Sequence, residues 1–189
     1  LRSEYTALGV DFEARNALFD EAIEVIRGIW AEDDFAFDGR GFSARGQSAN
    51  PKPAHVPIWV GGNSRLSRRR VAAIGDGWAP FPAPRTLAST AKTPALETVE
   101  DLQAMLDELW PMVEAAGRDP RSVDVVFGSP DGGAPGDVGF DAAAQIAGLA
   151  DLARRSVTWA TVTIPGDSIE HAIDAIGRYG DTVIAPMRD

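Results

Sequence analysis

The chain contains no cysteine and only two histidines among its 189 residues. Without cysteine there is no disulfide, no thiolate nucleophile and no zinc–cysteine site, which fits a reducing, cytoplasmic environment. His55 and His171 lie too far apart in the sequence to form a histidine-rich motif, so we predict no metal site. Lysine is equally scarce: neither Lys52 nor Lys92 falls in a predicted strand, which leaves no obvious Schiff-base residue.

The sequence also lacks long apolar runs and an excess of basic residues. No segment is apolar enough to span a bilayer, and no signal-peptide pattern is present. With 18 Lys and Arg against 28 Asp and Glu, the formal net charge is −10. We therefore expect neither nucleic acid nor a membrane as a partner. A hydrophobic content of 44% is enough for a core in a single domain over residues 1–189.

The stretch from Pro57 to Arg70 reads as a buried strand, a glycine turn and the start of a helix. Ile58–Val60 is a short apolar run, as expected of a strand covered on both faces. Gly61 and Gly62 permit positive φ and let the backbone come close to whatever lies above the turn. The rest of the chain is organised around this stretch.

The helix that follows the glycine pair has the features of an anion site. Asn63 or Ser64 is suited to cap it, and Ser64 and Ser67 place two hydroxyls about one turn apart. Free N–H groups at a helix start attract anions. The local pattern leaves an ordinary strand-to-helix turn open as the alternative, because a lone glycine motif is a weak signal.

Helices elsewhere are predicted from apolar periodicity. They cover Asp11–Trp30, Ser64–Ile74, Val99–Ala116 with a kink or break at Pro111, Asp141–Arg154, and a last helix after Ser168 with Ile169, Ala172, Ile173 and Ile176 facing inward. A small hairpin is predicted within Phe35–Phe42. Irregular segments are predicted at 81–96, at 128–139, where we expect a mobile loop, and in a short tail at 183–185.

The order of these elements favours half of a barrel. The predicted strands Ile58–Val60, Gly77–Ala79, Val123–Phe127 and Val157–Ile164 alternate with helices, so we expect them to be parallel and adjacent in that order. Four strands are too few for a closed (β/α)8 barrel, and a small open doubly wound sheet is the alternative. The chain begins with a helix that no strand precedes. This favours an α/β fold that is the C-terminal half of a (β/α)8 barrel and comprises strands five to eight with their helices.

Several stretches resemble one known family. They are Glu4-Tyr5, Leu8-Gly9-Val10, Phe12, Arg15, Asp20-Glu21, Ile26, Trp30, Phe37-Asp38-Gly39, Pro51-Lys52-Pro53, Pro57–Ser64 and Gly75-Asp76-Gly77-Trp78. Together they resemble the bacterial luciferase-like monooxygenase superfamily, most closely its subgroup that uses the deazaflavin F420. The resemblance implies a (β/α)8 barrel, here preceded by its helix four and a hairpin insertion, with strands one to four absent.

The resemblance also implies a cofactor site and a chemistry. It points to Gly61, Gly62, Asn63, Ser64 and Ser67 as the residues that bind the phosphate of F420, or alternatively of FMN. It implies a flavin- or F420-dependent oxidoreductase of the monooxygenase type, acting on a small organic molecule. Catalytic residues carried by the absent half cannot be named from this sequence. Most of the arginines that follow, Arg65, Arg68, Arg69 and Arg70, are expected to be solvated.

Two other functions remain open from the sequence. The chain is either such an oxidoreductase, a non-catalytic half-barrel that pairs with another chain through an open sheet edge, or another phosphate-binding barrel enzyme. Pairing could be with an N-terminal half or with a second copy in a homo-oligomer. Binding of F420, FMN and a sugar phosphate, compared side by side, would distinguish the three functions, and four more strand–helix units in the genomic sequence upstream of Leu1 would settle whether the chain is truncated.

Overall fold

The computed structural model describes residues 2–129 and 131–188 of the chain. Internal contacts divide the chain into two compact units, Leu1–Val56 and Pro57–Asp189. The boundary falls at Pro57, where the predicted first strand begins. The expectation of one partial barrel domain over residues 1–189 stays a prediction, and the two units are described separately.

The first unit holds two helices and a hairpin. Helices α1 (Arg2–Ala7) and α2 (Arg15–Ala31) precede the antiparallel strands β1 (Phe35–Asp38) and β2 (Ser43–Gln47). The predicted hairpin is present but longer than expected, and α2 begins later than the predicted Asp11. The carboxylate of Glu21 on α2 accepts the N–H groups of Arg40 and Gly41, both at 2.9 Å. These bonds lower the pKa of Glu21 and fix the hairpin turn to the helix.

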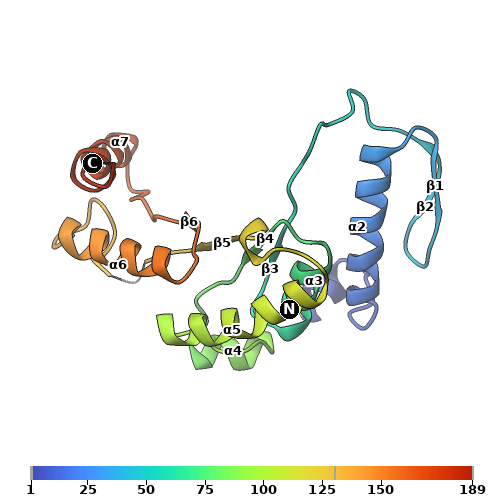
Figure 1. Cartoon of the computed structure of the whole chain (residues 1–189), viewed down its shortest axis with the longest axis horizontal. Coiled ribbons are helices and arrows are strands. Elements are labelled where there is room, and N and C mark those ends of the chain that lie inside the picture. Colours follow the sequence, from blue (N-terminus) through green and yellow to red (C-terminus); the bar gives the residue numbers. More distant parts are fainter. Residues whose placement is uncertain (1, 130, 189) are drawn as a thin grey trace. The chain divides into compact units, whose positions relative to one another are not determined.

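The second unit is built on a four-stranded parallel sheet in the order β3-β4-β5-β6. The strands are β3 (Trp59–Gly61), β4 (Gly77–Ala79), β5 (Asp124–Phe127) and β6 (Trp159–Ala160), and they lie side by side in chain order as predicted (Figure 1). The predicted strand Val157–Ile164 is wrong in length. Only its Trp159–Ala160 part pairs with β5, because β5 ends at Phe127, the residue opposite Ala160.

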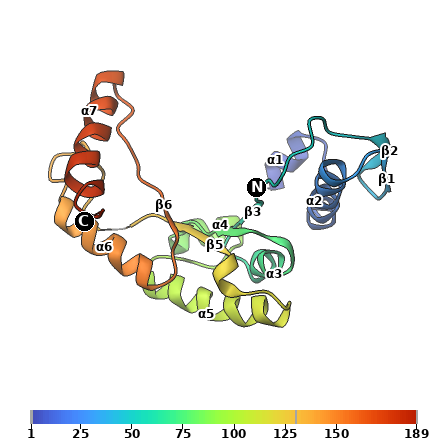
Figure 2. The ribbon, with the colours of Figure 1, turned by 45° about the horizontal axis from the view of Figure 1, so that its top comes forward.

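The core lies between this sheet and helices α3 (Arg65–Ile74) and α5 (Val99–Ala115). Both helices lie on the same side of the strands in Figures 1 and 2. The fully buried side chains include Val71, Trp78, Leu102, Leu106, Leu109, Val113 and Val125. α5 carries a capping box of Thr98 and Asp101 and runs through Pro111 without the predicted break. Pro111 is exposed, so the carbonyl that its missing N–H leaves free can be solvated.

The segment 81–96, predicted to be irregular, contains the helix α4 (Arg85–Ala91). Pro84 stands at its N-cap, and Lys92 ends it in the left-handed conformation with φ 51°. A bridge between Ala83 and Leu96 closes the segment at its base, with both N–H···O bonds formed. Proline at a helix start is compatible with helix formation, and the proline-rich composition obscured this short helix in the sequence.

The C-terminal helices differ most from expectation. A 3-10 turn at Pro120–Ser122 is followed by β5, α6 (Ala142–Arg154), β6 and α7 (Ile169–Tyr179). Helix α7 continues into a π-helical turn at Gly180–Ile184, where the sequence predicted a short tail. The prediction that Ile169, Ile173 and Ile176 face inward is wrong, since they are 75%, 63% and 57% exposed. Ala175 and Tyr179 on the other side of α7 are buried. The apolar stripe of α7 therefore has no cover within the described part of this chain.

Candidate functional site

The turn between β3 and α3 depends on glycine at position 62. Gly62 has φ +100°, and a Cβ at this position would lie 2.9 Å from Oγ of Ser67. Its N–H donates to the carbonyl of Ala79 at 3.2 Å, and its own carbonyl accepts Nε1–H of Trp78 at 2.9 Å. The turn is thus held against β4 by two hydrogen bonds in a conformation that L side chains rarely adopt.

Of the two caps that the sequence allowed, Asn63 and Ser64, it is Ser64 that caps α3. Its Oγ accepts the N–H of Ser67 at 3.0 Å, and the two hydroxyl oxygens are also 3.0 Å apart. The N–H groups of Arg65 and Leu66 stand in the first helical turn, where they have no intrahelical acceptor, and both residues are exposed. The structure therefore brings Gly62, Ser64, Ser67 and two backbone donors without an intrahelical acceptor together at the carboxyl end of β3.

Gly61 completes the turn with a different property. It is the exposed last residue of β3, and a Cβ added there would meet only the carbonyl oxygen of Ala79, at an ordinary 3.8 Å. The fold itself does not require glycine at this position. Its missing side chain leaves the backbone open to a close approach from outside.

Asn63 differs from the other predicted site residues because its side chain is buried and fully used. Its Nδ2 donates to the carbonyls of Phe81 at 2.9 Å and Pro94 at 3.3 Å, and its Oδ1 accepts the N–H of Phe81 at 3.0 Å. Asn63 is completely buried. Its side chain fastens the segment after β4 to the turn.

Arg68 is the arginine that departs from the expected solvated state. It is 4% exposed, and its guanidinium donates to the carbonyl of Asn63 and to the carboxylate of Glu108, both at 2.7 Å. Its charge is therefore directed into the fold. Arg65 and Arg69 are exposed, so their positive charges face solvent on α3.

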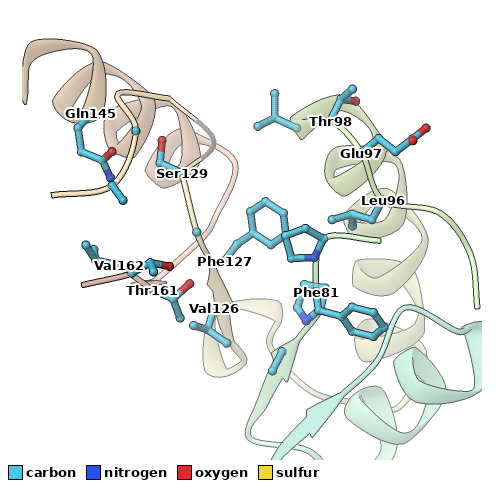
Figure 3. A pocket seen from close by; sticks show the side chains of 18 of the residues that line it. Phe81, Leu96, Glu97, Thr98, Val126, Phe127, Ser129, Gln145, Thr161 and Val162 are labelled. Atoms are coloured by element: carbon cyan, nitrogen blue, oxygen red, sulfur yellow. The ribbon is translucent and has the colours of Figure 1, made fainter. Parts of the chain in front are cut away.

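A pocket that the sequence did not indicate lies at the carboxyl ends of β4, β5 and β6. Its volume is about 760 Å³, within the range of small-molecule sites. Figure 3 shows it between the segment Leu96–Thr98 on one side and Ser129 and Gln145 on the other, with Phe127 and Thr161 below. Phe81, which Asn63 holds, also lines it. None of the described residues that line it is Lys, Arg or His, and Glu97 is its one carboxylate.

The pocket was missed because no motif contains it. Its residues come from strand ends and loops spread between Ala79 and Thr163. The available signal was the polar residues just after each strand, Ser129 after β5 and Thr161 after β6. Parallel strands bring such positions to one edge of a sheet.

The imidazole of His171 links α7 to the loop 128–139. Its Nδ1 lies 2.7 Å from Oδ1 of Asp167, and its Nε2 lies 3.2 Å from the carbonyl of Gly136. The Asp167 hydrogen bond raises the pKa of His171, and the Gly136 carbonyl adds to this effect. The same contact lowers the pKa of Asp167. The imidazolium has a donor for both acceptors, whereas the neutral ring has only one.

Together these observations define an α/β protein whose parallel strands lead into a turn and a pocket at their carboxyl ends, the arrangement of a partial (β/α)8 barrel. The sequence profile of the family described as luciferase-like monooxygenase matches residues 2–130. The chain belongs to this family. In the described residues no helix is long and apolar enough to cross a membrane, and no cluster of three potential metal ligands is found among them.

Curated relatives match over parts of the chain. An uncharacterized protein of Mycobacterium tuberculosis is 38% identical over 76 residues, 40% of this chain and 26% of the relative. The FMNH2-dependent dimethylsulfone monooxygenase of Pseudomonas fluorescens is 35% identical over 79 residues, covering 40% and 22%. The F420-dependent glucose-6-phosphate dehydrogenase of Nocardia farcinica is 30% identical over 118 residues, covering 61% and 30%. The matches span between 22% and 30% of these relatives' own lengths.

Solved structures support the fold. Monooxygenase RslO1 from Streptomyces bottropensis superimposes with a TM-score of 0.71 at 17% identity, over 99% of this chain and 66% of that one. The F420-dependent tetrahydromethanopterin reductase of Methanopyrus kandleri gives a TM-score of 0.62 at 15% identity, over 88% and 62%. The predicted family and α/β half-barrel fold are therefore confirmed.

Proposed function

We propose that this chain carries the cofactor-phosphate site of a flavin- or deazaflavin-dependent oxidoreductase of the monooxygenase type, acting on a small organic molecule. The proposed cofactor is F420, with FMN as the alternative, because the relatives include proteins named for each. The observation that carries the proposal is the β3–α3 turn, which presents donors and an unshielded backbone at the carboxyl edge of the sheet.

The residues of this turn fit a phosphate group. Gly61 leaves space for an anion against the backbone, and Gly62 shapes the turn. The N–H groups of Arg65 and Leu66 and the hydroxyls of Ser64 and Ser67 would hold its oxygens, helped by the positive end of α3. Asn63 would support this site from beneath by fixing the turn to the Phe81 segment. When bound, a flavin or deazaflavin supplies hydride or oxygen chemistry, and the protein positions it and excludes water.

The neighbouring pocket suits a mostly uncharged ring or substrate. Apolar side chains such as Phe81, Val99 and Phe127 line it together with hydroxyls, and none of the described lining residues is a cation that would favour a phosphate. On this basis we propose that the anion binds at the turn and the reacting portion in the pocket. We propose that the complete site also needs further strand–helix units, on the same polypeptide, a partner chain or a second copy, because the described sheet ends at β3 and β6 without closing.

A substitution at Gly61 tests the phosphate site without straining the fold. Gly62→Val would force a β-branched residue into φ +100°, so a loss of binding would be ambiguous. At Gly61 an added Cβ has room within the chain, and the valine side chain of Gly61→Val would occupy the space assigned to phosphate. We expect it to weaken binding of F420 or FMN at least tenfold, about 1.4 kcal/mol, in titration calorimetry.

Riboflavin and a distant glycine provide the controls. Riboflavin lacks the phosphate, so Gly61→Val should leave its affinity unchanged. A Cβ added at Gly177 on α7 also meets open space, so Gly177→Ala should leave the affinity for each ligand unchanged. Circular dichroism melting establishes that each variant folds. If Gly61→Val binds F420 and FMN as tightly as the parent chain, the phosphate is not bound at this turn. Binding of a sugar phosphate in preference to either cofactor would favour another barrel enzyme.

A further inference from the structure

Gln145 is an unusual residue for its position in the fold. It stands in the first turns of α6, after the Asp141 cap, and it is 3% exposed although glutamine is mostly found at surfaces. Its side chain lines the pocket on the side opposite Leu96 and Thr98 (Figure 3). A helix that only needed to cover a core would carry an apolar residue here.

The amide oxygen of Gln145 has no hydrogen-bond partner among the described residues. Buried polar atoms are satisfied in the great majority of cases, and an unmet acceptor destabilises the fold. The loop that covers Gln145 is closely packed: a Cβ on Gly132, which has φ +78°, would come within 2.7 Å of the backbone nitrogen of Gln145. Gln145 thus lines the pocket with a buried acceptor that the described part of the fold does not use.

We propose that Gln145 is a ligand-binding residue whose Oε1 accepts a hydrogen bond from an N–H or O–H group of the molecule that occupies this pocket. The apolar side chains, and the lack of a cation among the described lining residues, favour an uncharged, largely apolar ring compound as that molecule. The donor belongs either to the substrate or to the uncharged ring of the cofactor. This inference deepens the proposed function, since it assigns the chemistry that the pocket recognises.

Matched pairs of small ligands separate these two sources. Indole carries a ring N–H that 1-methylindole lacks, and lumiflavin carries an N3–H that 3-methyllumiflavin lacks. Neither lumiflavin contains a phosphate, so their binding does not depend on the β3–α3 turn. Dissociation constants are measured by calorimetry for the complete protein, in which this chain is joined by the further strand–helix units, with the parent sequence, Gln145→Met or Gln145→Glu. Methionine matches the length of glutamine but removes the acceptor, and glutamate retains an acceptor.

We expect the parent chain to prefer the donor-bearing member of at least one pair by about fivefold to tenfold, the usual effect of one hydrogen bond. Gln145→Met should abolish this preference, and Gln145→Glu should retain it. Preference within the indole pair assigns the donor to the substrate, and preference within the lumiflavin pair assigns it to the cofactor ring. A failure of the phosphate site would appear in the FMN and riboflavin comparison and would leave these pairs unaffected.

Stability gives a second, independent readout. Because Oε1 is unmet in the free chain, Gln145→Met should unfold at the same urea concentration as the parent or a higher one. A clear fall of the midpoint would show that the amide serves the fold, and it would overturn the proposal. No preference in either pair for the parent chain, a preference that survives in Gln145→Met, or no binding of any of the four probes would also overturn it.

Discussion

The side chain of Asn63 connects the β3–α3 turn to the wall of the pocket, so its removal should loosen both. The change to examine is Asn63→Ala. It deletes two donor contacts, to the carbonyls of Phe81 and Pro94, and one acceptor contact, to the N–H of Phe81. All of this happens at a completely buried position.

The size of the effect follows from these contacts. The two bonds to Phe81, at 2.9 and 3.0 Å, have good geometry, and the 3.3 Å contact to Pro94 is weaker. A net value of about 1 kcal/mol for each good bond, plus a smaller amount for the third and for the space left behind, gives roughly 2–3 kcal/mol. With a urea m-value of about 2 kcal/mol/M, the unfolding midpoint should fall by roughly 1–1.5 M.

Asn63→Asp provides the matched control. It keeps the acceptor for the N–H of Phe81 but turns a carboxylate oxygen toward two carbonyl oxygens. This environment raises the pKa of the introduced carboxyl, so the variant should be less stable than Asn63→Ala at pH 7. Its deficit relative to the parent should shrink as the pH falls through that raised pKa, because the protonated carboxyl regains a donor. A loss below about 0.5 kcal/mol for Asn63→Ala, or a pH-independent deficit for Asn63→Asp, would refute this reasoning.

Two further predictions concern the C-terminal part of the chain. Because the pKa of His171 is raised, the stabilisation from its contacts with Asp167 and Gly136 is fully present below its unfolded pKa of about 6.5. This stabilisation is lost as the pH rises through the pKa of the folded state. The rate of amide hydrogen exchange in residues 131–139, corrected for its intrinsic dependence on pH, should therefore increase as the pH rises in the parent chain. The His171→Gln variant should show no such increase. Ile173→Ala should lower the free energy of unfolding, measured by urea denaturation, by less than about 0.5 kcal/mol, whereas Leu106→Ala should lower it by about 2–5 kcal/mol. A comparable loss at both positions would mean that the apolar stripe of α7 is covered in solution.

The sheet was predictable because its signals are local. Short apolar runs separated by helical periodicity gave the four strands, their parallel pairing and their order. Strand ends were less predictable, because they depend on neighbours. The segment from Val157 to Ile164 carries β-preferring residues but pairs over only two of them, since β5 ends at Phe127, opposite Ala160. Propensity alone cannot report how far a partner strand extends.

The turn after β3 was predictable in its backbone and not in all of its side chains. Short-range geometry allowed positive φ at Gly61 and Gly62 and a cap at Asn63 or Ser64, and the structure has positive φ at Gly62 and the cap at Ser64. Asn63 is suited by its chemistry to cap a helix or to bind an anion. In the fold its amide instead meets groups 18 and 31 residues further along the chain. Contacts of that range have no signature in a single sequence.

The misprediction of α7 has a physical explanation of its own. Apolar periodicity reports that one face of a helix is suited to burial, but it does not identify what buries it. The three isoleucines are more than half exposed, and contact with water does not stabilise an apolar side chain. A helix that faced only solvent would not carry them along one face. The pattern is accounted for if α7 and the unpaired side of β6 are covered in the functional assembly by strand–helix units outside the described residues. On this argument the sequence pattern describes the assembled barrel more closely than it describes this chain in isolation.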